Sequence, residues 1–396
     1  MEDFHQIRRL PPYVFEEINR LKVAARAAGS DIIDFGMGNP DIPTSPSIVE
    51  KLREVVQDPC THRYSVSKGI RNLREAQSSY YARRFGVHLD PESQVIVTLG
   101  SKEGFANMAQ AITAPGDVIL CPNPTYPLHT FGFLMAGGVI RSIPIEPNND
   151  FFVSLEHAMR HSFPKPSVLI LNYPSNPTTY IATIDFYKEV VVFAKKHQII
   201  LLSDLAYSEI YFNNCPPPSI LEVPGAVDCA VEFTTMSKTF SMAGWRIGFA
   251  VGNARLLSAL SRVKSYLDYG AFTPIQLAAA HALNHCTEDV EKIRKIYKSR
   301  RDVLVKTFTE AGFDVPLPDA TMFAWAKIPK PFRHLRSLEF SKILLKEANI
   351  VVAPGIGFGE RGDSYVRISL VENENRILQA SHSLKRFFSN LDERID

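Results

Sequence analysis

The chain has 396 residues, of which 45% are hydrophobic and 22% charged, and its 44 basic and 42 acidic residues leave a formal net charge of +2 at pH 7. This composition is typical of a globular protein with one large core and room for a second, smaller domain. The balance of charge excludes an extended basic surface for nucleic acid and an acidic tail.

Short β-branched runs alternate with helical patterns through the first two-thirds of the chain. Strands are expected at residues 95–99, 118–121, 168–172, 199–203 and 231–235. Helices are expected between and after them at residues 101–113, 185–197 and 254–265. This alternation predicts an α/β fold whose mostly parallel sheet is flanked by helices. In such sheets ligands gather at the carboxyl ends of the strands.

The pattern changes at about residue 287. The stretch TEDVEKIRKIYKSRRDVLVKTFTEAG predicts a long helix that ends near Gly312. Strand-like TMFAWAKI, IVVAPG and YVRISL follow, with helices at 337–348 and at the end of the chain. We therefore predict an N-terminal arm with part of a small domain (1–46), a large domain (47–286) and a small α+β C-terminal domain (287–396).

Cysteine usage indicates a reducing compartment. The five cysteines are odd in number and include no CxxC pair: Cys60, Cys121, Cys215, Cys229 and Cys286. The opening MEDFHQIRRLPPYVF lacks the apolar run of a signal peptide, and no apolar stretch is long enough to span a membrane. These features predict a cytoplasmic protein with no membrane partner.

Three strand ends carry polar groups suited to a ligand. In VTLGSKEG a strand passes through Gly100 and Ser101 into a helix, which aims free N–H groups and the helix dipole at one spot. In NYPSNPTT, Asn176 precedes a proline, and the Asn176–Pro177 bond is a candidate for the cis form. In LLSDLAYS, Asp204 ends a buried strand. Taken singly, each has a purely structural alternative: a helix cap at Ser101, a proline turn at Asn176 and a helix N-cap at Asp204.

The stretch TMSKTFSMAGWRIGF (235–249) places Lys238 at the end of a buried strand without a neighbouring acid. An unpaired buried charge is costly, so this lysine is either solvated or employed covalently. Thr235, Ser237 and Arg246 are suited to hold a phosphate. A lysine that reaches solvent beside a structural arginine is the alternative.

An arginine, Arg367, lies inside the apolar alternating strand YVRISL. A substrate carboxylate would suit it through a bidentate pair, and an internal salt bridge is the alternative. Together the clusters supply an anion site, a carboxylate, an amide, a lysine and an arginine. Caps, turns and salt bridges do not readily explain why all five occur together, so the combination favours a ligand site.

On these motifs the chain resembles the class I/II aminotransferases, pyridoxal-phosphate enzymes of the aspartate aminotransferase fold (fold type I). The resemblance rests on SKTFSMAGWR (237–246), NYPSNP and SDLAY, and extends from GNPD (38–41) to RIS (367–369). Within the family it is strongest to bacterial glutamate–pyruvate (alanine-forming) aminotransferases, through RLPPYVF, DFGMGNPD and KSYLDYG. It implies transfer of an amino group between an L-amino acid and a 2-oxo acid with ping-pong kinetics, and a place in alanine biosynthesis.

The resemblance also implies roles for single residues. Lys238 would bind the cofactor covalently and shuttle the proton. Asp204 would pair with the pyridine nitrogen. Asn176 and Tyr207 would hydrogen-bond the ring hydroxyl oxygen, and Tyr126 would stack on the ring.

The remaining roles concern the phosphate and the substrate. Ser101, Lys102, Arg246 and Thr235 would hold the cofactor phosphate, with Thr235 standing where the family often has serine. Tyr64 would reach the phosphate of the neighbouring subunit, which implies a homodimer with shared active sites.

Arg367 would bind the substrate carboxylate with help from the backbone of Gly38 and from Asn176. Side-chain specificity stays open, and aspartate, methionine and diaminopimelate are alternative substrates. A fold-type-I lyase is an alternative reaction.

Two other motifs match known sites poorly. Ser65-Val-Ser-Lys68 has the SxxK spacing of serine acyl enzymes but lacks the accompanying SDN and KTG motifs. His281 and His285 have metal-ligand spacing on an expected helix but lack a third ligand. The sequence therefore predicts no metal site.

Overall fold

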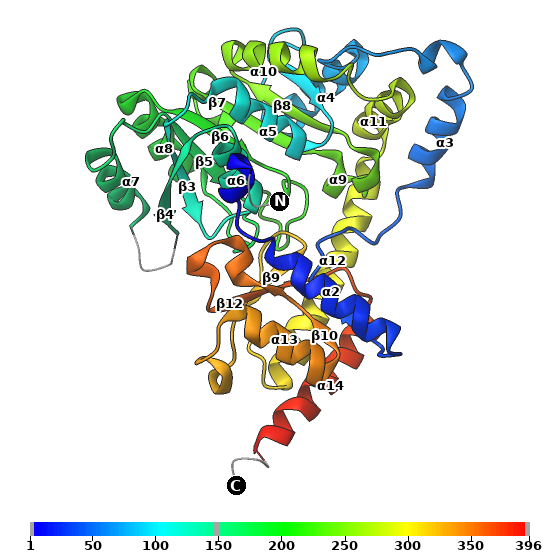
Figure 1. The fold of residues 1–396 in the computed structure, drawn as a ribbon. Helices are drawn as coiled ribbons and strands as arrows, with labels where there is room; N and C mark the ends of the chain where they lie inside the picture. The colour runs from blue at the N-terminus through cyan, green and yellow to red at the C-terminus, as the bar shows by residue number, and fades with distance from the viewer. Residues whose placement is uncertain (1–3, 146–149, 393–396) are drawn as a thin grey trace.

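The computed structural model describes residues 4–145 and 150–392, and a seven-stranded sheet forms the centre of its larger part (Figure 1). The strand order is β2-β8-β7-β6-β5-β3-β4, with β8 antiparallel to both of its neighbours and the other pairs parallel. The strands are β2 (Val95–Thr98), β3 (Val118–Asn123), β4 (Val139–Pro144), β5 (Val168–Asn172), β6 (Ile200–Asp204), β7 (Ala230–Thr235) and β8 (Gly248–Gly252). The predicted mostly parallel α/β sheet is thus confirmed.

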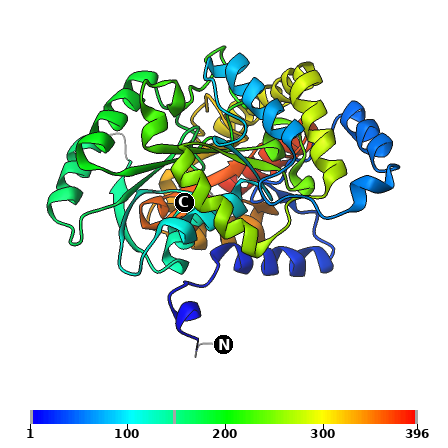
Figure 2. The same ribbon diagram turned by 90° about the horizontal axis from the view of Figure 1, so that it is seen from above.

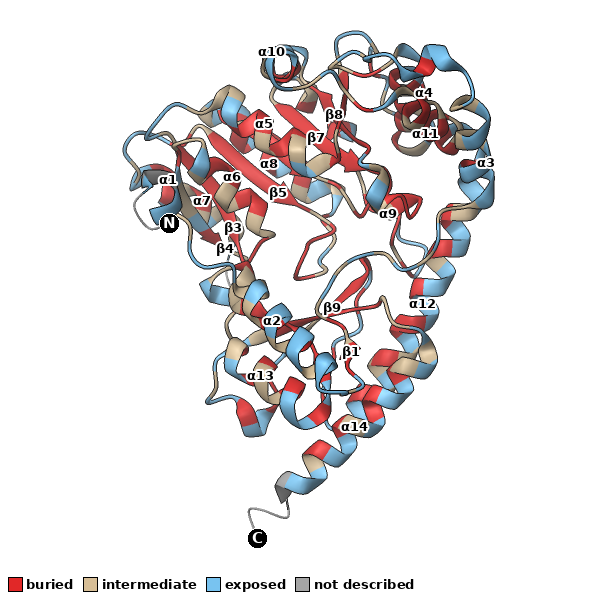
Figure 3. Cartoon of the chain, turned by 45° about the vertical axis from the view of Figure 1, so that its right-hand side comes forward, coloured by how far each residue is buried: buried red, intermediate tan, exposed pale blue. Residues whose placement is uncertain are grey.

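Helices cover both faces of this sheet (Figure 2). One face packs against α5 (Ser101–Ile112), α6 (Pro127–Met135) and α10 (Ala254–Leu267). The other packs against α3 (Pro46–Val55), α4 (Arg71–Phe85), α7 (Phe151–Arg160), α8 (Ile184–His197) and α11 (Thr273–His285). Because both faces are covered, the inner strands are buried along their length (Figure 3), which explains their almost continuous apolar runs.

A separate hydrophobic core forms the smaller part of the molecule. Its sheet has the order β11-β12-β9, and β1 pairs with β10 beside it. The strands are β1 (Ile33–Asp34), β9 (Phe323–Lys327), β10 (Ile350–Val351), β11 (Ala353–Pro354) and β12 (Tyr365–Ser369). The helices are α1 (His5–Arg8), which lies beside the larger part, α2 (Val14–Ala27), α12 (Thr287–Glu310), α13 (Ser337–Ala348) and α14 (Glu374–Asp392).

The N-terminal segment belongs physically to this smaller part. Strand β1 pairs in parallel with β10, and Ile18 of α2 packs in a small cluster with Leu345 of α13. The predicted domain limits at residues 46 and 286 stay a prediction. No helix in the described ranges is long and apolar enough to cross a membrane.

The five expected strands of the large sheet lie within about two residues of their predicted positions, as do the expected helices. Strands β4 and β8 were not predicted, because β4 is a partly exposed edge strand and β8 is rich in glycine. The run IVVAPG forms two short strands, β10 and β11, in different sheets. The long helix α12 ends two residues before Gly312, whose φ is +97°.

The strand register brings the predicted polar residues to one edge of the large sheet. Asn172 pairs with Asp204 across β5 and β6. Gly248 pairs with both Thr98 of β2 and Thr235 of β7. A Cβ on Gly248 would lie 2.4 Å from the backbone nitrogen of Ser101, so only glycine lets the turn before α5 approach β8 this closely.

Candidate active site

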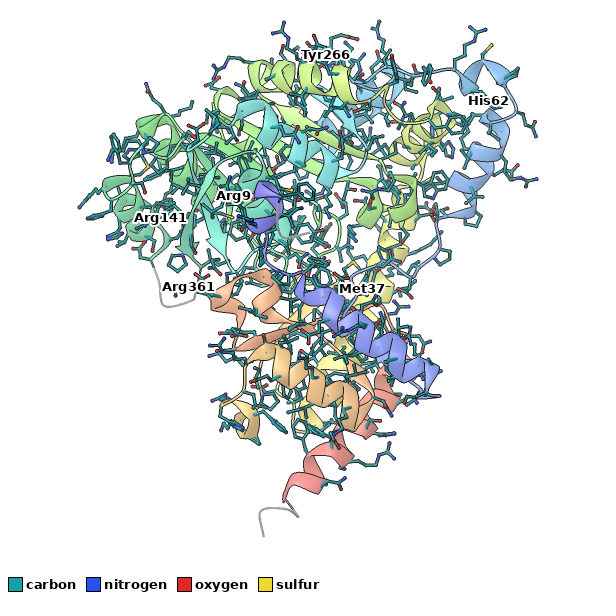
Figure 4. The ribbon with its side chains drawn as sticks, in the orientation of Figure 1. Arg9, Met37, His62, Arg141, Tyr266 and Arg361 are labelled. Carbon is teal, nitrogen blue, oxygen red and sulfur yellow. The ribbon has the colours of Figure 1, made fainter. Side chains whose placement is uncertain are left out.

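A cavity of about 780 Å³ opens at this edge, between the two parts of the chain. Met37, which lines it, marks its position in Figure 4. All the predicted site residues except Tyr64 line this cavity: Gly38, Ser101, Lys102, Tyr126, Asn176, Asp204, Tyr207, Thr235, Lys238, Arg246 and Arg367. The fold therefore gathers in one place residues that are up to 329 positions apart in the sequence (367 − 38).

Lys238 lies on the single turn α9 (Met236–Thr239), directly after β7. The Thr235 hydroxyl accepts the backbone N–H of Ser237 at 3.2 Å and so caps this turn. The ammonium of Lys238 donates to the carbonyl of Gly38 at 3.1 Å. Burial, and then the charges of Arg367 and Arg246, lower the pKa of Lys238 to about 8. A useful fraction of neutral amine is therefore present near neutral pH, as a nucleophilic lysine requires.

Asp204 ends β6 and lines the cavity, and buried neighbours hold its carboxylate. Its Oδ2 lies 2.9 Å from Nε2 of His129, whose Nδ1 lies 2.7 Å from the hydroxyl of Thr125. His129 is fully buried. The Asp204 Oδ1 accepts the backbone N–H of Ala206 at 3.1 Å, so Asp204 also caps the following turn, which was the alternative interpretation.

Sequence reasoning missed His129 and Thr125. They flank the predicted Tyr126 at positions i and i+4 around the start of α6. Thr125 precedes Tyr126 and His129 lies in the first turn of α6, and no local pattern marks either of them as part of a site. Asn172 opens the motif NYPSNPTT and was not predicted as a site residue. Its amide donates to the carbonyl of Asp204 at 3.1 Å, and its oxygen accepts the N–H of Asn176 at 2.9 Å.

Arg367 extends from β12 into the cavity, and its hydrogen-bond partners among the described residues are neutral. Its Nη1 donates to Oδ1 of Asn176 at 2.8 Å and its Nη2 to the carbonyl of Gly36 at 3.1 Å. No carboxylate of the described residues pairs with Arg367, and its buried Nε has no partner among them. Burial lowers its pKa to about 10. The internal salt bridge offered as the alternative is therefore absent from the described residues, and the guanidinium is suited to an anion.

The aromatic ring of Phe323 forms the floor under this guanidinium. The centre of the Arg367 guanidinium lies 4.0 Å from the Phe323 ring centroid. A Cβ on Gly38 would come within 2.7 Å of the same ring, so only glycine lets the backbone at position 38 approach Phe323 this closely. The ring of Tyr207 meets Phe323 edge-on at 5.6 Å. Burial raises the pKa of the Tyr207 and Tyr126 phenols, so both keep their protons for donation.

The turn from β2 into α5 and the side chain of Arg246 form an anion site. Gly100 precedes the helix with φ of +81°, and a Cβ there would lie 2.1 Å from Nη2 of Arg246. Arg246 has φ of +58° and donates to the carbonyl of Leu99 at 3.3 Å. Ser101 and Lys102, the first residues of α5, line the cavity together with Arg246, and the first N–H groups of a helix have no partner within the helix.

Tyr64 lies outside the cavity with 86% of its surface exposed. Its ring packs on that of Tyr269, with 4.7 Å between centroids. Within one chain the structure does not bring Tyr64 to the other site residues. Tyr64 was expected to contact the site of a neighbouring subunit, and that role stays a prediction.

The two poorly matching motifs show ordinary surface interactions. Lys68 of the SxxK sequence pairs with Glu92 at 3.0 Å. His281 lies 3.0 Å from the hydroxyl of Ser47. Within residues 4–145 and 150–392 no group of three or more His, Cys, Asp or Glu side chains is placed to hold a metal ion.

Comparison with known proteins identifies this arrangement. A family model described as aminotransferase class I and II matches residues 30–381. AatC of Rhizobium meliloti (strain 1021) is 72% identical over 99% of this chain and 97% of its own length. The glutamate-pyruvate aminotransferase AlaC of Escherichia coli (strain K12) is 53% identical over 97% of this chain and 93% of its own. The substrate-bound BacF structure from Bacillus subtilis superposes with a TM-score of 0.89 at 34% identity, covering 96% of both chains.

Proposed function

Because the chain belongs to the class I and II aminotransferases, we propose that it binds pyridoxal 5′-phosphate in the cavity at the carboxyl edge of its sheet and transfers amino groups between L-amino acids and 2-oxo acids. One observation carries the proposal: a lysine of lowered pKa, a supported carboxylate and an arginine that has no acidic partner among the described residues face one cavity. This set meets the three needs of the reaction, which are a nucleophilic amine, an anion for the cofactor ring and a cation for the substrate.

The residues present fit the cofactor. Its phosphate would be held by Arg246, by the hydroxyl of Thr235 and by the start of α5 at Ser101 and Lys102. A side chain at position 100 would collide with Arg246, so this turn requires Gly100. Pyridoxal phosphate would supply an electron sink for the carbanion formed at the substrate Cα and carry the amino group between the two half-reactions.

Asp204 would keep the ring nitrogen protonated. His129 fixes the orientation of this carboxylate, because it contacts Oδ2 while the backbone of Ala206 holds Oδ1. Arg367 occupies the oxygen of the Asn176 amide, which leaves the amide NH2 to donate to the ring oxygen. The protonated phenol of Tyr207 is a second donor for that oxygen, and the ring of Tyr126 would stack on the cofactor.

The protein groups also act on the substrate directly. Arg367 would bind the α-carboxylate and so orient the substrate Cα toward Lys238. The Lys238 amine, kept partly neutral by burial and two guanidinium groups, would take the proton from Cα and return it. The carbonyl of Gly38 would hold the Lys238 ammonium in place before the cofactor binds.

We propose glutamate and pyruvate as the principal amino donor and acceptor, with alanine as the product. Support comes from the 53% identity to the glutamate-pyruvate aminotransferase AlaC over nearly the whole chain. We further propose a homodimer in which Tyr64 completes the neighbouring site, because Tyr64 and Tyr269 form an exposed aromatic pair on one face. The five free cysteines support a place in the cytoplasm.

Single half-reactions test this proposal. The purified protein should show the visible absorbance of a lysine-bound cofactor, and glutamate or alanine should each shift it while releasing 2-oxoglutarate or pyruvate. Aspartate, methionine and diaminopimelate, tested separately, should react more slowly. Ammonia release without transfer would indicate a lyase instead. Wild-type turnover by Lys238→Ala would refute the assignment of the lysine.

A further inference from the structure

A lysine outside the cavity is buried between two acids. Lys264, in the last turn of α10, has no exposed side-chain surface. Its ammonium donates to Oε1 of Glu103 at 3.0 Å and to Oδ2 of Asp268 at 2.9 Å. Tyr266, two residues later on the opposite face of the helix, is 86% exposed at the edge of the molecule (Figure 4). Lys264 therefore points inward, at a position where burial of an unpaired ammonium would be costly.

The first acid belongs to the proposed phosphate site. Glu103 is the third residue of α5, directly after Ser101 and Lys102. Its Oε2 accepts the backbone N–H of Leu99 at 2.8 Å, and the carbonyl of Leu99 accepts a hydrogen bond from Arg246 at 3.3 Å. The Glu103 carboxylate thus fixes Leu99 and the turn that leads into α5. The carbonyl of the same Leu99 accepts the hydrogen bond from Arg246.

The second acid belongs to the loops that carry Tyr64 and Tyr269. The Oδ1 of Asp268 accepts the N–H of Gly270 at 2.6 Å, and its backbone carbonyl accepts the hydroxyl of Ser67 at 2.6 Å. Gly270 has φ of +78°, and a Cβ there would lie 2.3 Å from the carbonyl of Val66. The loops at 64–69 and 268–270 are thus packed together, and Asp268 links them to Lys264.

We propose that Lys264 is a positioning residue for phosphate binding. Its ammonium fixes the position of the turn at residues 99–102 of its own site relative to the loop that carries Tyr64, the residue proposed to reach the neighbouring site. The proposal rests on the proposed function, because it assumes that the anion at this turn is the cofactor phosphate. It adds a residue that touches neither cofactor nor substrate. Loss of the ammonium leaves Glu103 and Asp268 facing each other as like charges, and their repulsion would move both segments.

The phosphate itself provides a selective test. Apo-protein is titrated with pyridoxal phosphate and, separately, with pyridoxal, which lacks the phosphate. For Lys264→Met the affinity for pyridoxal phosphate should fall by about tenfold or more, as for other residues that orient a ligand-binding group. The affinity for pyridoxal should not change, because Lys238 and Asp204 are untouched. A general loss of structure would lower both affinities together and would overturn the proposal, as would no change in either.

Two further variants complete the experiment. Lys22→Met is the matched control, since Lys22 is also buried in an ion pair, with Asp34 at 2.8 Å, but does not contact the turn; it should leave the ratio of the two affinities unchanged. If Lys264→Met does not fold, Glu103→Gln is judged by the same ratio, because it keeps an acceptor for Leu99 and removes the ion pair. Wild-type protein that bound neither compound would overturn the proposed function, whereas an unchanged ratio in the variants would overturn only the role of Lys264.

The link to Tyr64 is tested by a double-mutant cycle. Tyr64→Phe should weaken pyridoxal phosphate binding in the wild-type background and weaken it less in the Lys264→Met background, because the loop is already displaced there. Strictly additive effects would show that Lys264 acts on the turn alone and would overturn the coupling between the two segments.

Discussion

Arg367 and Asn176, 191 positions apart, are joined by a 2.8 Å hydrogen bond from the guanidinium Nη1 to the amide Oδ1. The bond crosses from the smaller part of the molecule to the carboxyl edge of the large sheet. Because the bond uses only Nη1 of the arginine and the oxygen of the amide, the guanidinium still has donors for an anion. The amide NH2 can still donate to an acceptor in the cavity. The residue proposed to bind the substrate carboxylate is thereby tied to a residue proposed to contact the cofactor.

Arg367→Lys should raise the KM for amino acid substrates strongly, by about tenfold to a hundredfold, because an ammonium cannot bind Asn176, Gly36 and a carboxylate with the geometry of a guanidinium. Cofactor content should stay near that of the wild type. Steady-state kinetics and the absorbance spectrum measure both. Arg376→Lys is the control, since Arg376 makes a bidentate pair with Asp31 on the surface. Equal KM values for the Arg367 variant and the wild type would argue against carboxylate binding.

The rate at which apo-protein binds pyridoxal phosphate covalently should rise with pH through a midpoint near the Lys238 pKa of about 8. Only the neutral amine reacts, and its fraction grows as pH rises through the pKa. The charge of Arg367 contributes to the lowering, so Arg367→Met should move the midpoint upward, although burial remains the larger cause. Stopped-flow absorbance across pH 6 to 10 would show the shift. A midpoint that stays in place would mean that Arg367 does not act on Lys238.

His129→Leu should lower the rate of the half-reaction by about tenfold or more, because it leaves Asp204 Oδ2 without its buried partner at 2.9 Å. The hydroxyl of Thr125 also loses its contact with the ring nitrogen. His129→Asn, which restores a donor to this position, should recover part of the rate. His281→Leu is a control at a partly exposed histidine that does not line the cavity and contacts the hydroxyl of Ser47. Full activity of His129→Leu would show that Asp204 needs no support from this side.

The residues at the strand ends could be predicted because their local patterns are strong. Asp204 ends a buried strand, Lys238 and Asn176 follow one, and parallel strands bring their carboxyl ends to one edge. Arg367 stood out because a charge inside an apolar strand needs an anion. The pattern could not decide between an internal salt bridge and a ligand, and the described contacts with Asn176 and Gly36 favour the ligand.

The supporting residues could not be predicted, because their roles depend on contacts across the chain. His129 reaches Asp204 over 75 positions, and Lys264 reaches Glu103 over 161. Each sits in an ordinary helical pattern, where a histidine or lysine would be expected to face solvent. Strand β8 was missed for a related reason: its glycine at position 248 matters only once β2, β7 and α5 are packed around it.

A buried carboxylate below the site should make stability depend on pH. Glu232 of β7 accepts hydrogen bonds from Tyr81, Ser203 and Ser219, yet burial raises its pKa from 4.5 to about 7. The folded state therefore holds this proton more tightly than the unfolded state, so its contribution to stability is full below pH 4.5 and is lost as pH rises through 7.

Glu232→Gln, which cannot ionise, should accordingly gain stability relative to the wild type as pH rises from about 5 to 8, even if the amide satisfies fewer donors and the variant is less stable at every pH. Thermal unfolding of both proteins at each pH measures the difference. Glu156→Gln is the control, because the bond from Lys196 lowers the pKa of the partly exposed Glu156 and its variant should show no such gain. A difference in melting temperature between wild type and Glu232→Gln that stays constant across this range would mean that Glu232 keeps one protonation state throughout.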